Sequence, residues 1–275
     1  MSLISINLTI FNKAHLLPEV LGGIFKNTFG KFEFIAVCDG CTDNSSDVLL
    51  EYLMKNSPKN LCRFEVLYSD NVFETKSNNL AMKASKGEHI IVIQDDQIIT
   101  SYGYDERLLK PFKHFSDVFA TTGRTAHNYA FNENSKFINS QTDDIGEWSD
   151  IVLPCDIADK TNTSNDVFQI RSTVNRGPLC ISHADLQTMG YLDEIYAPQE
   201  FCEHDLMMRM HKKLGKVCGF YNIDWWSKPE FGGTRDPNGH TKRWLFEANH
   251  KNSKIFYERH KDEIKNRTIE NRVLI

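Results

Sequence analysis

Residues 89–96 read HIIVIQDD, an apolar run that ends in polar and acidic residues. Its apolar part, IIVI, is the most hydrophobic strand-like run of the chain and is typical of a strand buried on both faces of a parallel sheet. Two aspartates, Asp95 and Asp96, follow the run after Gln94. Ligands of open α/β sheets bind beyond the carboxyl ends of the strands. The two carboxylates are therefore expected at a binding site.

The residues before this run alternate between strand and helix patterns. Strands are predicted over 4–9, 32–38 and 64–68, helices with one apolar face over 17–25 and 48–53, and a third helix over about 76–85. This alternation predicts βαβ units with right-handed crossovers and a parallel sheet that helices cover on both faces. The polar residues that follow the first two strands then lie at the same edge of the sheet as Asp95 and Asp96.

The alternation stops near residue 100. Residues 101–174 are polar and show little periodicity, and we expect them to build over the sheet and not to extend it. A strand is predicted at PLCIS (178–182), and a helix from about Glu203 that Gly215 ends. The residues from about 241 onward predict a charged helical tail.

The composition is that of an ordinary globular protein and excludes a disordered or fibrous chain. The 275 residues are 40% hydrophobic and 25% charged, and 32 Lys and Arg stand against 37 Asp and Glu for a net charge of −5. This acidic balance disfavours binding to nucleic acid. No apolar run is long enough to cross a bilayer, and the first residues do not resemble a signal peptide. We expect a cytoplasmic protein, at most peripheral to the inner face of the membrane.

Two common phosphate-binding motifs are missing from the sequence. No GxGxxG follows the first strand and no GxxxxGK[ST] occurs, so no glycine-rich loop holds phosphates at a helix N-terminus. Asp95 and Asp96 offer another route, because adjacent carboxylates repel each other unless a cation lies between them. Mg²⁺ or Mn²⁺, completed by water and by phosphate oxygens of the substrate, suits such a site. A solvated acidic turn is the alternative.

Several motifs occur in a fixed order along the chain. They are TIFNK at 9–13, VCDGCTDNSSDVL at 37–49, SKGEHIIVIQDD at 85–96, and NRGPLCIS, GYLDE and FCEHDLMMRM between 175 and 210. Together they resemble glycosyltransferases of the GT-A fold, family 2, over roughly residues 3–220. The resemblance implies a Rossmann-like, mostly parallel sheet in one domain. Its parts are a nucleotide-sugar-binding half over 1–100, an acceptor-binding and catalytic half over 101–220, and a C-terminal loop and helical tail over 221–275.

The resemblance implies a donor site at the strand ends. Phe11 is expected to pack on the nucleobase, with Thr9 and Asn12 beside it. Asp39 is expected to accept a hydrogen bond from the imide N–H of the base, which favours UDP or dTDP donors. The alternative for Asp39 is a simple turn after the strand.

Further residues are assigned to the metal and the phosphates. Asp95 and Asp96 match the metal-binding aspartates of the family, Asp96 as the more direct ligand, and His240 is expected to complete the shell of Mn²⁺ or Mg²⁺. An exposed loop residue is the alternative for His240. Where the family carries an arginine near the phosphates this chain has Asn78, and Lys76 is either its substitute or an ordinary solvated lysine.

The catalytic base and the acceptor side are assigned to the second half of the chain. Glu203 matches the acidic residue that accepts the proton of the acceptor hydroxyl, and Asp205 competes for this role. The alternative for both is an ordinary acidic helix N-terminus. Trp225, Trp226 and Arg176 are expected to contact the sugar or the acceptor, whereas a core position is the alternative for each tryptophan. The acidic residues named above are expected to converge on one cleft.

The resulting hypothesis is a metal-dependent, inverting glycosyltransferase. It moves a sugar from a nucleoside diphosphate to a hydroxyl of a glycan or glycolipid acceptor, in surface polysaccharide or glycolipid synthesis. A nucleotidyltransferase and a non-catalytic nucleotide- or glycan-binding module are the alternatives. The pair Cys38 and Cys41 forms a CxxC that also fits a redox motif. We interpret it as incidental, because both residues lie inside the donor-binding motif.

Overall fold

The computed structural model describes residues 2–131, 146–152, 166–233, 242–266 and 269–274. Its first hundred residues alternate between strands and helices as the sequence predicts. The strands are β1 (Ile4–Ile10), β2 (Phe32–Asp39), β3 (Leu61–Ser69) and β4 (His89–Gln94), and the helices are α1 (Leu17–Asn27), α2 (Ser45–Asn56) and α3 (Phe73–Ala84). All pairings among these four strands are parallel. The predicted βαβ arrangement is therefore confirmed.

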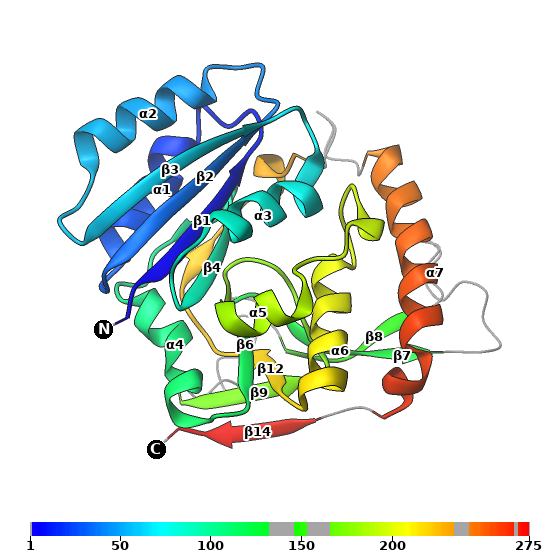
Figure 1. Ribbon diagram of the computed structural model, residues 1–275. Coiled ribbons are helices and arrows are strands. Elements are labelled where there is room, and N and C mark those ends of the chain that lie inside the picture. The colour runs from blue at the N-terminus through cyan, green and yellow to red at the C-terminus, as the bar shows by residue number, and fades with distance from the viewer. Residues whose placement is uncertain (1, 132–145, 153–165, 234–241, 267–268, 275) are drawn as a thin grey trace.

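Helices cover both faces of this parallel sheet (Figure 1). Alternate residues of β2 point to opposite faces, as the two-residue period of a strand requires. Ile35 and Val37 pack with Ala81 of α3 on one face. Phe34 and Ala36 join the cluster that α1 and α2 bury on the other face. Because both faces are buried, the strands read as apolar runs.

The second half of the chain extends the sheet, so the expectation for residues 101–174 is wrong in this respect. The strands that extend it are β6 (Val118–Thr122), β9 (Val167–Arg171), β11 (Leu179–Ser182), β12 (Val217–Phe220) and β14 (Glu270–Val273), and the helix α4 (Tyr104–His114) precedes β6. The strand order of the resulting nine-stranded sheet is β14-β9-β12-β6-β11-β4-β1-β2-β3. One sheet thus runs through the first half, the second half and the tail.

The short strand β6 explains why the sequence pattern did not predict that the second half extends the sheet. All five of its residues are buried, yet two are threonines, so neither an apolar run nor an alternation is visible. Tertiary contacts satisfy both hydroxyls. Thr121 Oγ1 donates to the carbonyl of Leu108 and Thr122 Oγ1 to that of Pro178. Buried polar side chains of this kind need partners that local sequence does not reveal.

The remaining described elements are short strands and the helices of the second half. They are β5 (Ile98–Ile99), β7 (Ala126–Phe131), β8 (Gly146–Val152), β10 (Thr173–Val174), β13 (Trp225–Trp226), α5 (His183–Met189), η2 (Glu194–Tyr196), α6 (Cys202–Leu214), η3 (Pro229–Phe231) and α7 (Arg243–Lys265). β10, β7 and β8 form one small sheet, and β13 pairs with β5 in another. Within the described ranges, no helix is both long enough and apolar enough to span a membrane.

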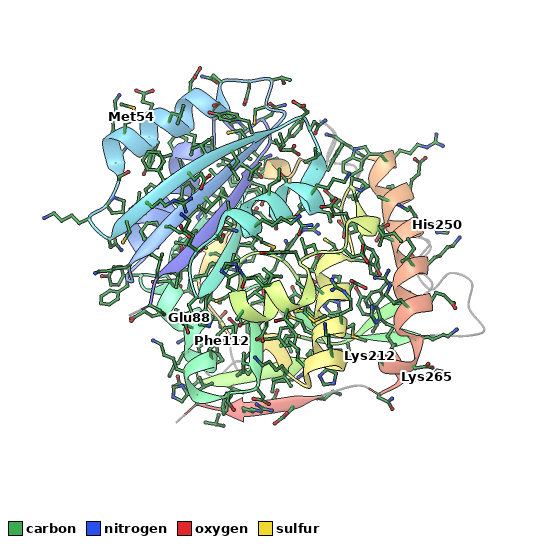
Figure 2. All side chains as sticks on the ribbon, in the orientation of Figure 1. Met54, Glu88, Phe112, Lys212, His250 and Lys265 are labelled. Atoms are coloured by element: carbon green, nitrogen blue, oxygen red, sulfur yellow. The ribbon has the colours of Figure 1, made fainter. Side chains whose placement is uncertain are left out.

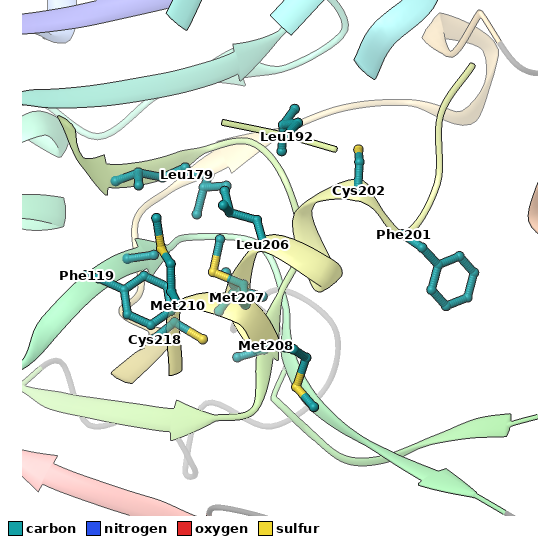
Figure 3. Packing of buried hydrophobic residues seen from close by; sticks show 14 of the residues in the cluster. Phe119, Leu179, Leu192, Phe201, Cys202, Leu206, Met207, Met208, Met210 and Cys218 are labelled. Atoms are coloured by element: carbon teal, nitrogen blue, oxygen red, sulfur yellow. The ribbon is translucent and has the colours of Figure 1, made fainter. Parts of the chain in front are cut away.

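Helix α6 carries the core of the second half. Leu206, Met207 and Met210 lie on its buried side, in one cluster with Phe119 of β6 and Leu179 of β11 (Figure 3). Gly215 ends the helix in a left-handed conformation with φ 66°, as predicted.

The helical tail is confirmed as α7, which runs beside α6 (Figure 1). An ion pair joins Lys212 of α6, labelled between the two helices in Figure 2, to Glu263 of α7. The tail therefore belongs to the folded body of the protein.

Candidate functional site

A cavity of about 430 Å³ opens at the carboxyl ends of β1, β2 and β4. Its walls come from both halves of the chain and from the tail. The lining residues are Thr9, Ile10, Phe11, Lys13, Asp39, Asn71, Phe73, Glu74, Ser77, Gln94, Asp95, Asp96, Arg124, Arg176, Gln199, Glu200, Gly232, Gly233, Lys242 and Trp244. The parallel strands place the polar ends of distant segments side by side, which is how α/β sheets form ligand sites.

Five residues predicted for the donor and the metal meet in this cavity: Thr9, Phe11, Asp39, Asp95 and Asp96. They come from three strand ends that are far apart in the sequence. The ends of β1 and β4 are tied together, because the backbone N–H of Phe11 donates to Oδ2 of Asp95 at 2.9 Å.

Asp39 organises the loop between β3 and α3. Its Oδ1 accepts hydrogen bonds from Ser69 Oγ at 2.8 Å and from the N–H of Val72 at 2.7 Å, and its Oδ2 accepts one from the N–H of Phe73 at 2.8 Å. A carboxylate has about four acceptor positions. Oδ2 of Asp39 therefore retains acceptor capacity toward the cavity.

Gly40 is required beside Asp39. Its φ is 62°, and a Cβ at this position would lie 2.6 Å from Cβ of Asn71 and 2.7 Å from its backbone nitrogen. Only glycine has neither the strain of this φ nor the collision. The tight approach brings Asn71 to the cavity wall.

Asp95 and Asp96 are the candidate metal ligands. Burial raises the pKa of Asp95 to about 7, although the charge of Lys13 opposes the shift. A bound cation reverses this logic, because it stabilises the ionised carboxylate. No group of three or more His, Cys, Asp and Glu side chains that could hold a metal ion occurs in the described ranges. Two carboxylates still fit Mg²⁺ or Mn²⁺, because these ions keep several waters and use phosphate oxygens of the substrate.

Arg176 pairs with three glutamates, two of which line the cavity with it. Its guanidinium lies 2.6 Å from Glu74, 3.1 Å from Glu200 and 3.2 Å from Glu203. Burial raises the pKa of Glu74 to about 7. The positive charge of Arg176 opposes this shift, whereas the negative charges of Glu203 and Glu200 add to it. Three carboxylates around one cation leave an excess negative charge in this part of the cavity.

Glu203 lies behind Arg176 and is not among the residues that line the cavity. Its side chain is buried, and Cys202 Sγ donates to its Oε2 at 3.1 Å. Burial opposes its ionisation, but the charges of Arg176 and His204 outweigh this effect and lower the pKa of Glu203 to about 2. Glu203, which the sequence-based interpretation makes the proton acceptor, is therefore already paired with Arg176 and is a weak base.

Asp205 braces α6 against α7 and does not reach the cavity. It accepts from Tyr196 Oη at 3.1 Å and pairs with Arg209 at 2.6 Å, Arg259 at 2.9 Å and His260 at 2.9 Å. Burial opposes its ionisation, but these partners, His260 and Arg209 foremost, lower the pKa of Asp205 to about 2. The expected convergence of all the acidic residues on one cleft therefore does not hold for Glu203 and Asp205.

Four other predicted site residues lie outside the cavity lining. Oδ1 of Asn12 accepts from the N–H of Thr42 at 2.7 Å, so this side chain ties two loops together. Lys76 is exposed on α3. Trp225 donates through Nε1 to the carbonyl of Gly123, and Trp226 packs on Phe231. In addition Asn78 is buried, and His240 lies outside the described residues. Arg176, which is predicted to contact the sugar or the acceptor, lines the cavity.

Six residues that line the cavity were not predicted from the sequence: Lys13, Glu74, Arg124, Glu200, Lys242 and Trp244. Lys13 stands inside the TIFNK motif at the end of the first predicted strand, and this place in the sequence was a signal that could have found it. Glu200 and Trp244 carry no such local signal. The backbone around Glu200 is unusual, because Glu200 and Phe201 have φ values of 74° and 67°.

The CxxC pair shows no sign of redox chemistry. Cys38 and Cys41 are both free thiols. Burial raises the pKa of Cys38 to about 12, and Cys41 Sγ donates to the carbonyl of Ile10 at 3.3 Å. A reactive thiol needs a lowered pKa, so the raised pKa values of both thiols favour a packing role for the pair.

Comparisons with known proteins agree with this fold. The family model described as Glycosyl transferase family 2 matches residues 5–175. Glycosyltransferase GlyG of Streptococcus pneumoniae serotype 4 is 32% identical over 98 residues, which are 35% of this chain and 31% of that protein. The chain thus aligns with about a third of the length of this curated relative.

Solved structures show the same fold at low identity. The structure of S. aureus TarS 1–349 superposes with a TM-score of 0.53 at 13% identity and covers 82% of this chain and 60% of that one. The mannosyltransferase PcManGT of Pyrobaculum calidifontis, in complex with GDP-Man and Mn²⁺, gives a TM-score of 0.55 at 11% identity and covers 79% and 54%. These matches confirm the predicted GT-A α/β architecture. With the family match over 5–175, they show that the chain belongs to glycosyl transferase family 2.

Proposed function

We propose that this protein transfers a sugar from a nucleoside diphosphate sugar to a hydroxyl acceptor. The observation that carries the proposal is the meeting of Phe11, Asp39, Asp95 and Asp96 in one cavity at the carboxyl ends of parallel strands. An aromatic ring, a hydrogen-bond acceptor and a pair of carboxylates suit the base and the diphosphate of such a donor. The reported complexes of TarS with UDP and of PcManGT with GDP-Man and Mn²⁺ support this class of ligand.

UDP or dTDP sugars are the proposed donors. Oδ2 of Asp39 has room for one more hydrogen bond, which the imide N–H of uracil or thymine would donate. Phe11 is 39% exposed and offers a ring face without a polar group. A flat base can stack there.

The diphosphate is proposed to lie between the aspartates and the cationic side chains of the cavity. Lys13, Arg124 and Lys242 line the same space as Asp95 and Asp96. Mg²⁺ or Mn²⁺ bound by the two aspartates would supply Lewis-acid stabilisation of the departing nucleoside diphosphate. The lysines and the arginine hold the remaining phosphate charge.

Glu200 is the carboxylate we propose as the catalytic base. It lines the cavity, its Oε1 is fixed by Arg176 at 3.1 Å and by Gln199 at 3.1 Å, and within the described residues its Oε2 accepts no hydrogen bond. In the proposed step the acceptor oxygen forms a bond to the anomeric carbon and its proton passes to Oε2 of Glu200. The bond from that carbon to the phosphate oxygen breaks, and inversion results. Glu203 is the alternative base that the resemblance indicates.

Two matched variants separate these bases. Glu200→Gln is expected to keep donor affinity and to lose transfer by about 100-fold or more, the usual effect of a general base. Glu203→Gln is expected to keep transfer within about tenfold of wild type. Normal transfer by a folded Glu200→Gln variant, together with loss of transfer in Glu203→Gln, would assign the base to Glu203.

The function itself is tested with a panel of UDP, dTDP and GDP sugars, Mn²⁺ and a set of glycan acceptors. We expect release of a nucleoside diphosphate that increases when an acceptor is present. Pyrophosphate release from a nucleoside triphosphate and a sugar phosphate would identify a nucleotidyltransferase. Donor binding without turnover would favour a non-catalytic module. The expected role in surface polysaccharide or glycolipid synthesis stays a prediction.

A further inference from the structure

Three aromatic side chains from distant segments line the same cavity. Phe11 follows β1, Phe73 begins α3, and Trp244 lies in the first turn of α7. The rings of Phe73 and Trp244 touch edge to face, with centroids 5.3 Å apart and planes inclined at 61°. The tail of the chain therefore completes a wall that begins at the donor-binding strand ends.

The position of Phe73 is fixed by the residue proposed to read the base. Its backbone N–H donates to Oδ2 of Asp39 at 2.8 Å. Its φ of 65° lies in the left-handed region, which is costly for a bulky side chain. Such strain persists only where the surrounding structure enforces it, and it clusters at ligand sites. The hydrogen bond to Asp39 thus holds Phe73, and with it the contact between Phe73 and Trp244, next to Asp39.

The aromatic wall is incompletely covered. Phe11 and Phe73 remain 39% and 37% exposed, and Trp244 is half-buried. Charged side chains form much of the rest of the lining. Exposed aromatic surface inside a polar cavity is unfavourable in water and is relieved when a flat apolar face covers it. Of the parts of a nucleotide sugar, the base has the largest flat face, and Asp39 places it at this wall.

We propose that Trp244 packs on the nucleobase of the donor and, together with Phe73, forms the outer wall of the base pocket. This inference rests on the proposed function, because it requires a nucleotide ligand. It assigns to the C-terminal helix a role in donor binding. From the sequence, only Phe11, with Thr9 and Asn12 beside it, is predicted to pack on the base. Trp225 and Trp226, the pair predicted to contact sugars, lie outside the cavity lining.

Tryptophan fluorescence tests the proposal without turnover. The chain has four tryptophans. We expect titration with UDP and Mn²⁺ to quench the emission of the wild type and of the control Trp226→Phe by similar amounts. Trp244→Phe is expected to bind UDP but to lose most of the quench. An unchanged quench in Trp244→Phe would overturn the proposal.

Calorimetry with a ligand that has no base provides the second measurement. Trp244→Ala is expected to weaken UDP binding about tenfold, as stacking losses do, and to leave inorganic pyrophosphate binding unchanged. Equal losses for UDP and pyrophosphate, or wild-type affinity for UDP, would overturn the assignment of Trp244 while nucleotide binding by the wild type still stands. Absence of any nucleotide binding by the wild type would remove the proposed function as well.

Discussion

Nη1 of Arg176 lies 3.2 Å from Oε1 of Glu203, and the side chain of Glu203 is buried while that of Arg176 is 14% exposed. This ion pair joins the strand end after β10 to the first turn of α6. It holds the guanidinium so that its remaining nitrogens face Glu74 and Glu200 in the cavity. Glu203 thereby acts on the cavity through Arg176, and a loss of Glu203 is expected to change stability more than chemistry.

Glu203→Gln is expected to destabilise the protein by about 1–3 kcal/mol at pH 7, the cost of an unsatisfied buried partner. The pKa of Glu203 is lowered to about 2 in the folded protein, so its contribution is fully present above pH 4.5 and fades as the pH falls toward 2. The difference in urea stability between the variant and the wild type should therefore be smaller at pH 3 than at pH 7. The exposed Glu19→Gln serves as control and should match the wild type at both pH values. A constant difference across this range would contradict the pairing.

Glu74→Gln should show the opposite dependence on pH. The pKa of Glu74 is raised to about 7, so the folded protein binds a proton more tightly than the unfolded chain between pH 4.5 and 7. The wild type consequently loses stability as the pH rises through this window. The melting temperature of the variant relative to the wild type is expected to rise from pH 5 to pH 8. A relative melting temperature that falls over this window speaks against the excess negative charge around Arg176.

Asp205→Asn tests the assignment of this residue to structure. Removal of one charge from a buried network with Arg209, Arg259 and His260 is expected to cost about 3–5 kcal/mol. The exposed Asp262→Asn on α7 provides the matched control and should cost less than about 0.5 kcal/mol. Nucleotide affinity at low temperature, where the variant is folded, should equal that of the wild type. If the variant loses sugar transfer but keeps normal stability, Asp205 has a catalytic and not a structural role.

Gly40→Ala and Gly103→Ala separate strain from collision. Both glycines have positive φ, at 62° and 73°, but only a Cβ at Gly40 meets the backbone of Asn71, whereas nothing lies within 4 Å at Gly103. Each substitution is expected to cost about 1–2 kcal/mol from the backbone conformation. Gly40→Ala should in addition lower UDP affinity, because Asn71 lines the cavity. Calorimetry that finds equal UDP affinity in both variants would show that the loop after β3 does not shape the donor pocket.

Sequence patterns predicted the parts of the fold and the site that depend on local structure. The apolar runs and amphipathic helices of residues 1–100 fix βαβ units, and this topology brings Asp39, Asp95 and Asp96 to one edge of the sheet. Gly215 marks the end of α6 by its backbone conformation. These features follow from short-range rules.

The features that the sequence did not predict depend on long-range contacts. Glu200 is presented to the cavity by a turn whose carbonyls accept from Asn252 of α7, which donates to Gln199 and Glu200 at 2.8 and 3.1 Å. Trp244 reaches the cavity because α7 packs beside α6. In both cases the partner lies tens of residues away, and no local pattern carries its position. The resemblance predicted Glu203 as the catalytic base, but the structure pairs this carboxylate with Arg176.

Calorimetric titration with UDP, dTDP and GDP, each with and without Mn²⁺, measures whether the cavity binds the nucleotide part of a sugar donor. The wild type and the control Asp47→Asn, exposed on α2, are expected to bind at least one of these nucleotides more tightly in the presence of Mn²⁺. Asp96→Asn is expected to lose this dependence on Mn²⁺ while it keeps its fold. If the wild type binds none of the three nucleotides under any condition, the cavity at the ends of β1, β2 and β4 is not a nucleotide-sugar site.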